Sequence, residues 1–146
     1  MSKGNTFEND WMKLIFNATA IANIADNASG SPLTNLYVSL HKTDPGEGGD
    51  QTTGEVQTSE YGQYARQPVA RSSGGWTVTA NSVSPVANID FPQMTSGTGA
   101  TIQYFAVGVA ASGATKILYS GSVAPSIVLS NGVTPRLTTA SAITED

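Results

Sequence analysis

From residue 31 onward the chain is a series of short runs rich in β-branched and aromatic residues, separated by glycine-containing turns. In the first run Leu36, Val38 and Leu40 occupy every second position, which is the period of a half-buried strand. Further runs follow at residues 64–71, 76–80, 86–91, 102–109, 116–123, 126–130 and 137–143. No helical segment interleaves them, which argues against a parallel α/β sheet. The pattern predicts a mainly β fold, a single-domain antiparallel β-sandwich or jelly roll of about eight strands.

Turn residues and prolines predict where individual strands end or lie at the edge of a sheet. The dipeptide Asn131-Gly132 between two apolar runs predicts a tight hairpin. Proline has no N–H to donate to a sheet, so a proline near a strand is expected at an edge or at a strand end. The prolines within or beside the runs are Pro68, Pro85, Pro92, Pro125 and Pro135.

The segment before residue 26 has a different period, because its apolar residues recur at intervals of three and four, as on one face of an α-helix. These residues are Phe7, Trp11, Leu14, Ile15, Ala18 and Ile21. Asn5 and Glu8 have the spacing of a capping pair, and residues 26–32 are rich in helix breakers. We expect an amphipathic helix from residue 5 to about 17, with further turns through Ile24 as the alternative. The helix and linker, residues 1–30, would pack on a β-sandwich domain formed by residues 31–146.

A long gap between predicted strands, residues 42–63, contains no basic residue after Lys42. A loop of this length in a compact domain is usually functional or disordered. Asp44, Glu47 and Asp50 are three residues apart, but they do not match the EF-hand pattern, so we expect no calcium site. The acidic residues of the loop are Asp44, Glu47, Asp50, Glu55 and Glu60.

Composition excludes several classes of site. The 146-residue chain has no cysteine and one histidine, His41, which removes disulfides, cysteine-based zinc sites and histidine-rich metal sites. Its net charge of −4 argues against binding to nucleic-acid phosphates. No apolar run approaches the roughly 18 residues of a membrane span, and none follows Lys3 as in a secretory signal. We therefore expect no cofactor, no contact with membranes, and assembly in a cytoplasm.

His41 and Asp90 are the residues that could carry catalysis. His41 could pair with a serine, but the chain lacks a G-x-S-x-G motif, and the strand period places His41 outward at a strand end beside the acidic loop. Asp90 stands between Ile89 and Phe91, so the same period directs it toward solvent or a partner. We expect no catalytic residue and no enzymatic activity.

The face most suited to a partner is the apolar stripe of the predicted helix, with Phe7, Trp11 and Ile15. This face either covers one end or side of the sandwich or docks onto a neighbouring subunit, since aromatic anchors dominate interfaces. A bridging helix would do both. Arg66 and Arg71 are the basic candidates for a partner contact, although five residues apart they face opposite sides of a regular strand. Each arginine has two further alternatives. It forms an ion pair with the acidic loop, within one subunit or between subunits, or it is simply exposed to solvent.

Several segments are similar to those of a family of small structural proteins of tailed bacteriophages. The likeness begins with NTFENDWMKLIFNATAIANIA (residues 5–25) and SPLTNLYVSLH (residues 31–41), which Asp44-Pro-Gly follows. It continues through WTVT, NIDFP, FAVG and KILYSG to NGVTPRL (residues 131–137), and so covers nearly the whole chain. Some members are tail-fibre-like, and others resemble head decoration or cement proteins. The family carries no catalytic motif that could be transferred to this chain.

The resemblance implies a virion structural protein that forms a dimer or trimer. A tail fibre usually extends through repeats or a coiled-coil stalk, and the chain has neither. The first hypothesis is therefore a capsid decoration or cement protein that binds the major capsid protein between capsomers and stabilises the expanded head. The alternative is a tail-fibre-like or receptor- and glycan-binding protein at the tail, with Trp76, Tyr61, Tyr64 and the 42–63 loop as contacts.

Overall fold

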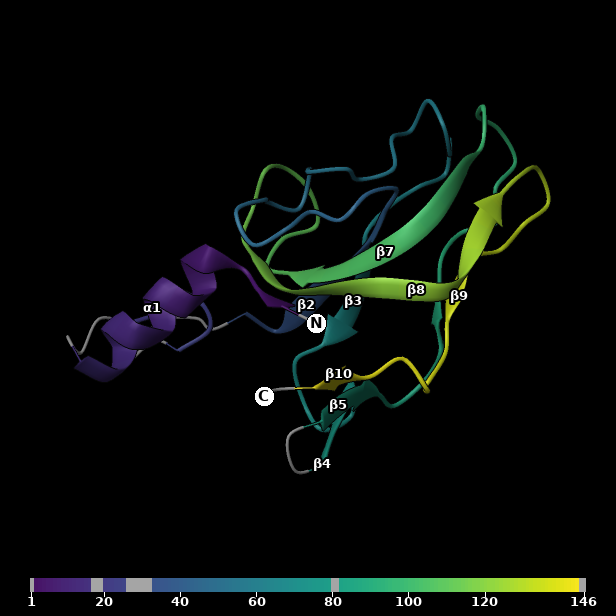
Figure 1. Ribbon diagram of the computed structural model, residues 1–146. Coiled ribbons are helices and arrows are strands. Elements are labelled where there is room, and N and C mark those ends of the chain that lie inside the picture. Colours follow the sequence, from purple (N-terminus) through teal and green to yellow (C-terminus); the bar gives the residue numbers. More distant parts are fainter. Residues whose placement is uncertain (1, 17–19, 26–32, 80–81, 145–146) are drawn as a thin grey trace.

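The computed structural model describes residues 2–16, 20–25, 33–79 and 82–144. Within these residues the chain forms one helix and a succession of strands (Figure 1). The elements are β1 (Ser2–Lys3), α1 (Asn5–Phe16), β2 (Asn35–His41), β3 (Gln67–Ala70), β4 (Trp76–Thr79), β5 (Ser82–Pro85), β6 (Ile89–Asp90), β7 (Ala100–Gly108), β8 (Ile117–Leu129), β9 (Arg136–Leu137) and β10 (Ile143–Thr144).

All strand pairs are antiparallel, and they form three sheets. The central sheet has five strands in the order β1-β8-β7-β2-β3. A three-stranded sheet, β10-β5-β4, lies on one side of it, and a two-stranded pair joins β6 to β9 (Figure 1). The mainly β, antiparallel fold with one N-terminal helix is therefore confirmed.

One face of the central sheet buries apolar side chains, and the other buries polar side chains of β2. Val38, Leu40 and Val107 belong to one hydrophobic core, which extends to Ile89 on β6 and Ile143 on β10. The alternate residues of β2, Ser39 and His41, face the other way and are also buried. The segment after β2 covers that polar face at Ser39 and His41, so residues 38–41 of β2 are buried on both faces of the sheet.

β7 and β8 form the longest pairing in the fold. Tyr104 pairs with Ser122 but Ile102 pairs with Ile127, so β8 bulges between these two points. The sequence runs 116–123 and 126–130, predicted as two strands, are therefore one bulged strand. Conversely, the run 137–143 contains two short strands, β9 and β10, and the run 86–91 contributes only β6, while β5 precedes it.

The prolines lie where the absence of an N–H costs nothing. Pro68 is in the edge strand β3, and Pro85 ends β5. Pro125 lies in the β8 bulge, where β1 no longer pairs with β8. Pro92 follows β6, and Pro135 precedes β9. The expectation of edges and strand ends is confirmed for Pro68, Pro85, Pro92 and Pro135, whereas Pro125 lies inside β8 at its bulge.

Asn131-Gly132 forms a turn in which Gly132 has a φ of +90°, but this turn does not close a hairpin. β9 pairs with β6, and Gly132 N–H donates to the carbonyl of Met94, so the chain leaves β8 after the turn. The predicted hairpin is wrong because pairing with a distant strand replaces the local one.

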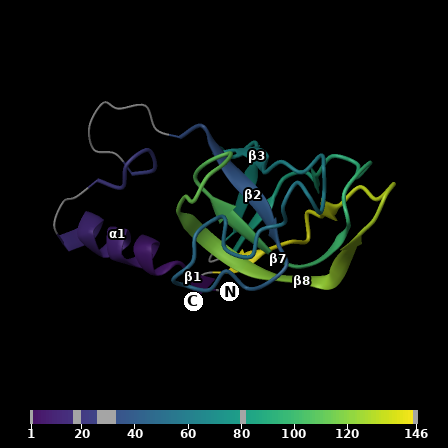
Figure 2. The same cartoon turned by 90° about the horizontal axis from the view of Figure 1, so that it is seen from above.

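α1 agrees to within one residue with the predicted helix and extends away from the β body (Figure 2). Residues 20–25 form a turn closed by backbone pairing of Ile21 with Ala25, and Ile21 is buried. The proposed boundary between linker and body, at residues 30 and 31, lies outside the described residues.

Candidate functional site

α1 is attached to the body through its first two turns. The backbone N–H of Asn5 donates to the carbonyl of Glu47 at 2.7 Å, and the Phe7 ring meets Tyr119 of β8 edge-on at 5.8 Å. The Lys116 ammonium donates to the Asp10 carboxylate. Partial burial lowers the pKa of Lys116. These contacts fix the start of the helix relative to the central sheet.

Trp11 follows these contacts and remains 49% exposed, so the apolar stripe is divided along the helix. Phe7 packs on its own chain, as the covering interpretation expects. Trp11 keeps a large apolar surface in water, as the docking interpretation requires. The side chain of Ile15 lies outside the described residues.

An apolar cavity of about 530 Å³ opens between the central sheet and the three-stranded sheet. Leu36, Leu118 and Tyr119 form its wall on the central sheet, whereas Trp76 and Val83 line it from β4 and β5. The indole N–H of Trp76 is buried and has no hydrogen-bond partner. The cavity joins residues from six strands, so no local sequence pattern could reveal it.

Arg66 is 5% exposed and is held inside the protein by Glu55. Its Nε donates to Glu55 Oε1 at 2.7 Å and its Nη2 to Glu55 Oε2 at 2.8 Å. Further bonds run to the carbonyls of Ala110 and Gly113 at 3.1 and 3.0 Å. Burial by itself lowers the pKa of Arg66, but its hydrogen bonds and the Glu55 charge outweigh burial and raise that pKa. Its pairing with the acidic loop thus occurs within one chain, and Arg66 offers no open surface to a partner.

Arg71 is exposed and lines the rim of the apolar cavity. Its guanidinium donates to the backbone carbonyls of Asn23, Ile24 and Leu33, and so connects the end of β3 to the segment that follows α1. Arg66 and Arg71 therefore make no common basic patch, as the sequence spacing indicates.

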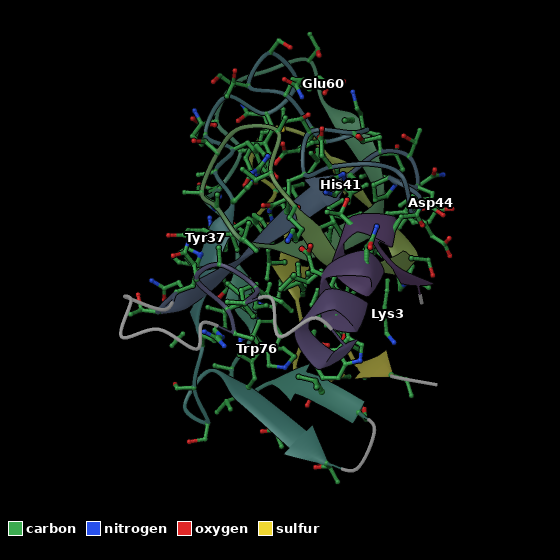
Figure 3. The ribbon with its side chains drawn as sticks, turned by 90° about the vertical axis from the view of Figure 1, so that its left-hand side faces the viewer. Lys3, Tyr37, His41, Asp44, Glu60 and Trp76 are labelled. Atoms are coloured by element: carbon green, nitrogen blue, oxygen red, sulfur yellow. The ribbon has the colours of Figure 1, made fainter. Side chains whose placement is uncertain are left out.

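His41 is fully buried, which corrects the expectation of an outward side chain. Its Nδ1 donates to the carbonyl of Thr53 at 2.8 Å, so its Nε2 accepts from the Ser39 hydroxyl at 2.8 Å. Burial lowers the pKa of His41 and favours the neutral ring. The strand period places His41 opposite Leu40 correctly, but the 42–63 loop covers that face (Figure 3). Ser39 is equally buried, so a substrate has no path to this pair.

The loop reaches the sheet through Gln51, which is completely buried. Its side-chain oxygen accepts hydrogen bonds from Val109 N–H, Ala110 N–H and the Thr115 hydroxyl at 3.1, 3.2 and 2.6 Å. Gly108 lies directly beneath it, where a Cβ atom would overlap the Gln51 amide. The acidic loop is thus an integral layer of the fold.

Asp44 and Asp50 stabilise turns within this loop. Asp44 accepts the N–H of Gly46 at 2.9 Å, and Asp50 accepts the N–H and hydroxyl of Thr52 at 2.7 and 2.6 Å. These bonds lower the pKa of Asp50. In the described part of the chain, no three acidic or histidine side chains converge as a metal site would require.

Asp90 is exposed, as the strand period predicts, and accepts hydrogen bonds from Arg136 on the paired strand β9. These bonds lower the pKa of Asp90. No helix in the described ranges has the length and apolar character needed to cross a bilayer.

Comparison with protein families places this architecture in a known group. The model of the family described as "Podophage GP4 fiber I protein gp80" matches residues 3–144, almost the entire chain. The chain belongs to this fibre I family. It is therefore a bacteriophage structural protein, as the resemblance in sequence indicates. No match was found among curated proteins.

In this member of the fibre I family, the aromatic residues considered for glycan contacts are turned inward. Tyr61 is fully buried and donates to the carbonyl of Pro92. Tyr64 donates to Glu55 at 2.7 Å and accepts the N–H of Leu40 at 3.1 Å. Trp76 lines the apolar cavity on the other side of the central sheet from His41 (Figure 3). Tyr61 and Tyr64 therefore offer no open stacking platform for a sugar, whereas Trp76 faces the apolar cavity.

Proposed function

We propose that this protein is a structural subunit of a tail fibre in a bacteriophage virion. The observation that carries the proposal is the fibre I family match over residues 3–144. A fibre subunit must hold its shape and offer fixed surfaces to its neighbours. The central sheet, with the loop packed on β2, supplies the fixed shape, and the protruding helix supplies such a surface.

The protein acts by association, without turnover of a substrate. Its one histidine is buried beside Ser39, and its exposed Asp90 is paired with Arg136. Neither arrangement offers a reactive group to a solvent-borne substrate. The partners in this proposal are further copies of the chain, as a dimer or trimer, and adjoining virion proteins after assembly in the host cytoplasm.

A capsid decoration role is the second candidate, and the compact body favours it. The sequence contains neither a repeat nor a heptad stalk with which a single chain would extend into a fibre. A decoration subunit would bind the major capsid protein in the expanded shell and stabilise that state by mass action. The family description favours the fibre role.

A cryo-electron microscopy map of the complete virion tests the proposal. The β body, with its central sheet and protruding helix, should fit density in an appendage of the tail. Density for this fold on the outer face of the head, and none at the tail, would replace the fibre role with the decoration role.

A further inference from the structure

The N-terminal arm, residues 2–10, contacts its own chain at a site that every copy of the chain presents equally. β1 lies at the edge of the central sheet, where Ser2 pairs with Ser120 of β8 and Lys3 pairs with Tyr119. We propose that in the assembled protein this arm packs on β8 of a neighbouring copy, in exchange for an arm received from another copy. The proposal deepens the proposed function, because it names the contact through which copies associate.

The arm is attached to the body but does not form part of its core. Among the described side chains, the hydrophobic core includes no residue of β1 or α1. All the groups that hold the arm lie on the body, in β8, just before it or in the 42–63 loop, so a second body offers the same site. These contacts are the two residue pairs of β1, the hydrogen bond from Asn5 N–H to the Glu47 carbonyl, the Phe7–Tyr119 ring contact and the Lys116–Asp10 ion pair.

The chain that follows the arm is long enough for an exchange. Arg71 holds the turn around the buried Ile21 on the body by donating to the carbonyls of Asn23 and Ile24. The 12-residue helix before this turn is about 18 Å long, and the intervening residues 17–20 span up to about 14 Å when extended. The arm can therefore reach a site about 30 Å from the turn, which is the diameter of a small domain. It can change bodies while the turn stays in place.

Exchange also accounts for the exposed part of the apolar stripe. In the single chain Trp11 lies one residue beyond Asp10, the last anchoring contact, and is 49% exposed. The helix then extends away from the body (Figure 2). In an exchanged pair the base of the helix lies on one body and its end returns to the other. Trp11 then lies between the two copies, which is the position of an aromatic anchor in an interface.

The exchange reuses contacts that the single chain already makes. It therefore needs no new complementary site for the arm, and it is a low-cost route to association. A chain holds its own arm at a high effective concentration, and copies that lie side by side in a virion offer a comparable concentration. A two-fold axis makes the exchange reciprocal, and a head-to-tail order closes a ring of three. Both a dimer and a trimer are thus compatible with one contact.

Engineered disulfides test the exchange, because the chain has no cysteine. Ser2→Cys and Ser120→Cys place thiols on directly opposite residues of β1 and β8, at a Cα separation that suits a disulfide. Full-length chains with one change each are co-expressed with different tags and equilibrated in a glutathione redox buffer. In the associated fraction we expect a disulfide between residue 2 of one chain and residue 120 of the other.

The control replaces Ser120→Cys with Ser126→Cys, which is exposed on β8 but does not pair with β1. The yield of the disulfide between residues 2 and 120 should exceed that of the control by at least about ten-fold, because only that pair is held at a high effective concentration. Peptide mass spectrometry identifies the two joined chains. Circular dichroism establishes that each variant keeps its β body.

Reversed charges test the same exchange without a covalent bond. Asp10→Lys or Lys116→Glu alone places like charges at the contact in every copy. When the two variants are mixed, an exchanged pair restores opposite charges at both contacts, whereas arms that stay on their own chains restore none. The mixture should therefore associate at least about ten-fold more tightly than either variant alone, as measured by sedimentation equilibrium. The chain with both changes restores the pair in reversed order and should associate like the wild type.

The results decide the exchange independently of the fibre role. A wild-type chain that stays monomeric at every concentration overturns it. So does a disulfide that forms within the Ser2→Cys/Ser120→Cys double variant but not between singly changed chains. A double variant that forms no such disulfide overturns it as well, since β1 would then not pair with β8. Mixed charge variants that associate no better than either alone have the same meaning. None of these results depends on where the protein lies in the virion.

Discussion

Arg66 and Glu55 form a two-point ion pair inside the protein, with nitrogen–oxygen distances of 2.7 and 2.8 Å. The pair joins the loop that covers the polar face of the central sheet to the segment that enters β3. Arg66 also bonds the carbonyls of Ala110 and Gly113, so it connects this loop to the β7–β8 connection. One side chain therefore fixes three parts of the chain that are distant in sequence.

Replacing Arg66 with methionine should destabilise the fold strongly, because it leaves the Glu55 carboxylate buried without its cation. The expected loss in the free energy of unfolding is about 3–5 kcal/mol. Urea denaturation followed by circular dichroism measures it. The double variant Glu55→Leu with Arg66→Met leaves no buried charge and should be more stable than the single variant.

The exposed pair of Asp90 and Arg136 is the matched control for this test. Both side chains lie in water, where solvent weakens an ion pair and holding two side chains together costs entropy. Arg136→Met should therefore change the urea midpoint far less than Arg66→Met does. Equal losses of stability in Arg66→Met and Arg136→Met would contradict the conclusion that the buried Arg66–Glu55 pair contributes far more to stability than the exposed pair.

His41 should make stability depend on pH in the weakly acidic range. Burial lowers its pKa in the folded chain, whereas the unfolded chain keeps a pKa near 6.5. Below about pH 6.5 the unfolded chain binds a proton that the folded chain does not, so the free energy of unfolding decreases. The slope reaches at most about 1.4 kcal/mol per pH unit and ends below the folded pKa.

Urea denaturation at intervals from pH 7.5 to 5, compared with His41→Gln, measures this contribution. The variant should lose less stability than the wild type over the same range, since the carboxyl groups that titrate lower are common to both. Parallel pH profiles for the two proteins would mean that His41 is not the group responsible.

Gly108 and Gln51 should be coupled energetically. A Cβ atom at residue 108 would overlap the Gln51 amide, so Gly108→Ala must displace a side chain whose oxygen accepts three hydrogen bonds. We expect Gly108→Ala to cost about 1–3 kcal/mol, as other overpacked sites do. In the Gln51→Ala background the same change should cost clearly less. Thermal or urea unfolding of the four proteins gives the coupling, and additive losses would show that the overlap is relieved elsewhere.

Phe7 should control how firmly α1 is held on the body. Phe7→Ala removes the edge-on contact with Tyr119, which is worth about 0.5–1.5 kcal/mol beyond area burial in comparable pairs. Amide hydrogen exchange should become faster throughout α1, whereas β7 and β8 remain protected. Unchanged exchange in α1 would show that the Asn5–Glu47 hydrogen bond and the Lys116–Asp10 pair secure the helix without Phe7.

The sequence predicts those parts of the fold that depend on local periodicity. The stripe through Phe7 and Trp11 identifies α1, and the alternation at Leu36, Val38 and Leu40 identifies β2 and its buried face. Two-residue strands such as β9 are too short to leave a period, and the bulge at Pro125 divides one long strand into two apparent runs. These differences arise because the short strands are defined by hydrogen bonding to strands that are distant in sequence. The local sequence period does not contain that information.

The candidate site is predicted less fully, for a related reason. The helix face with Trp11 is visible from sequence, but the apolar cavity combines residues from β2, β4, β5, β7, β8 and β10. His41 shows the same limit, since the period places it on the correct face but cannot reveal the loop that covers this face. Arg66 forms an ion pair with Glu55 of the acidic loop, which was one of the alternatives that the sequence left open. Only the tertiary structure shows that this pair forms within one chain.

The most direct test of the central claim is peptide mass spectrometry on virions separated into heads and tails, with known capsid and tail proteins as internal standards. The account predicts that this chain is enriched in the tail fraction, at a copy number set by the symmetry of the tail. Recovery with the heads alone, in proportion to the major capsid protein, would contradict it.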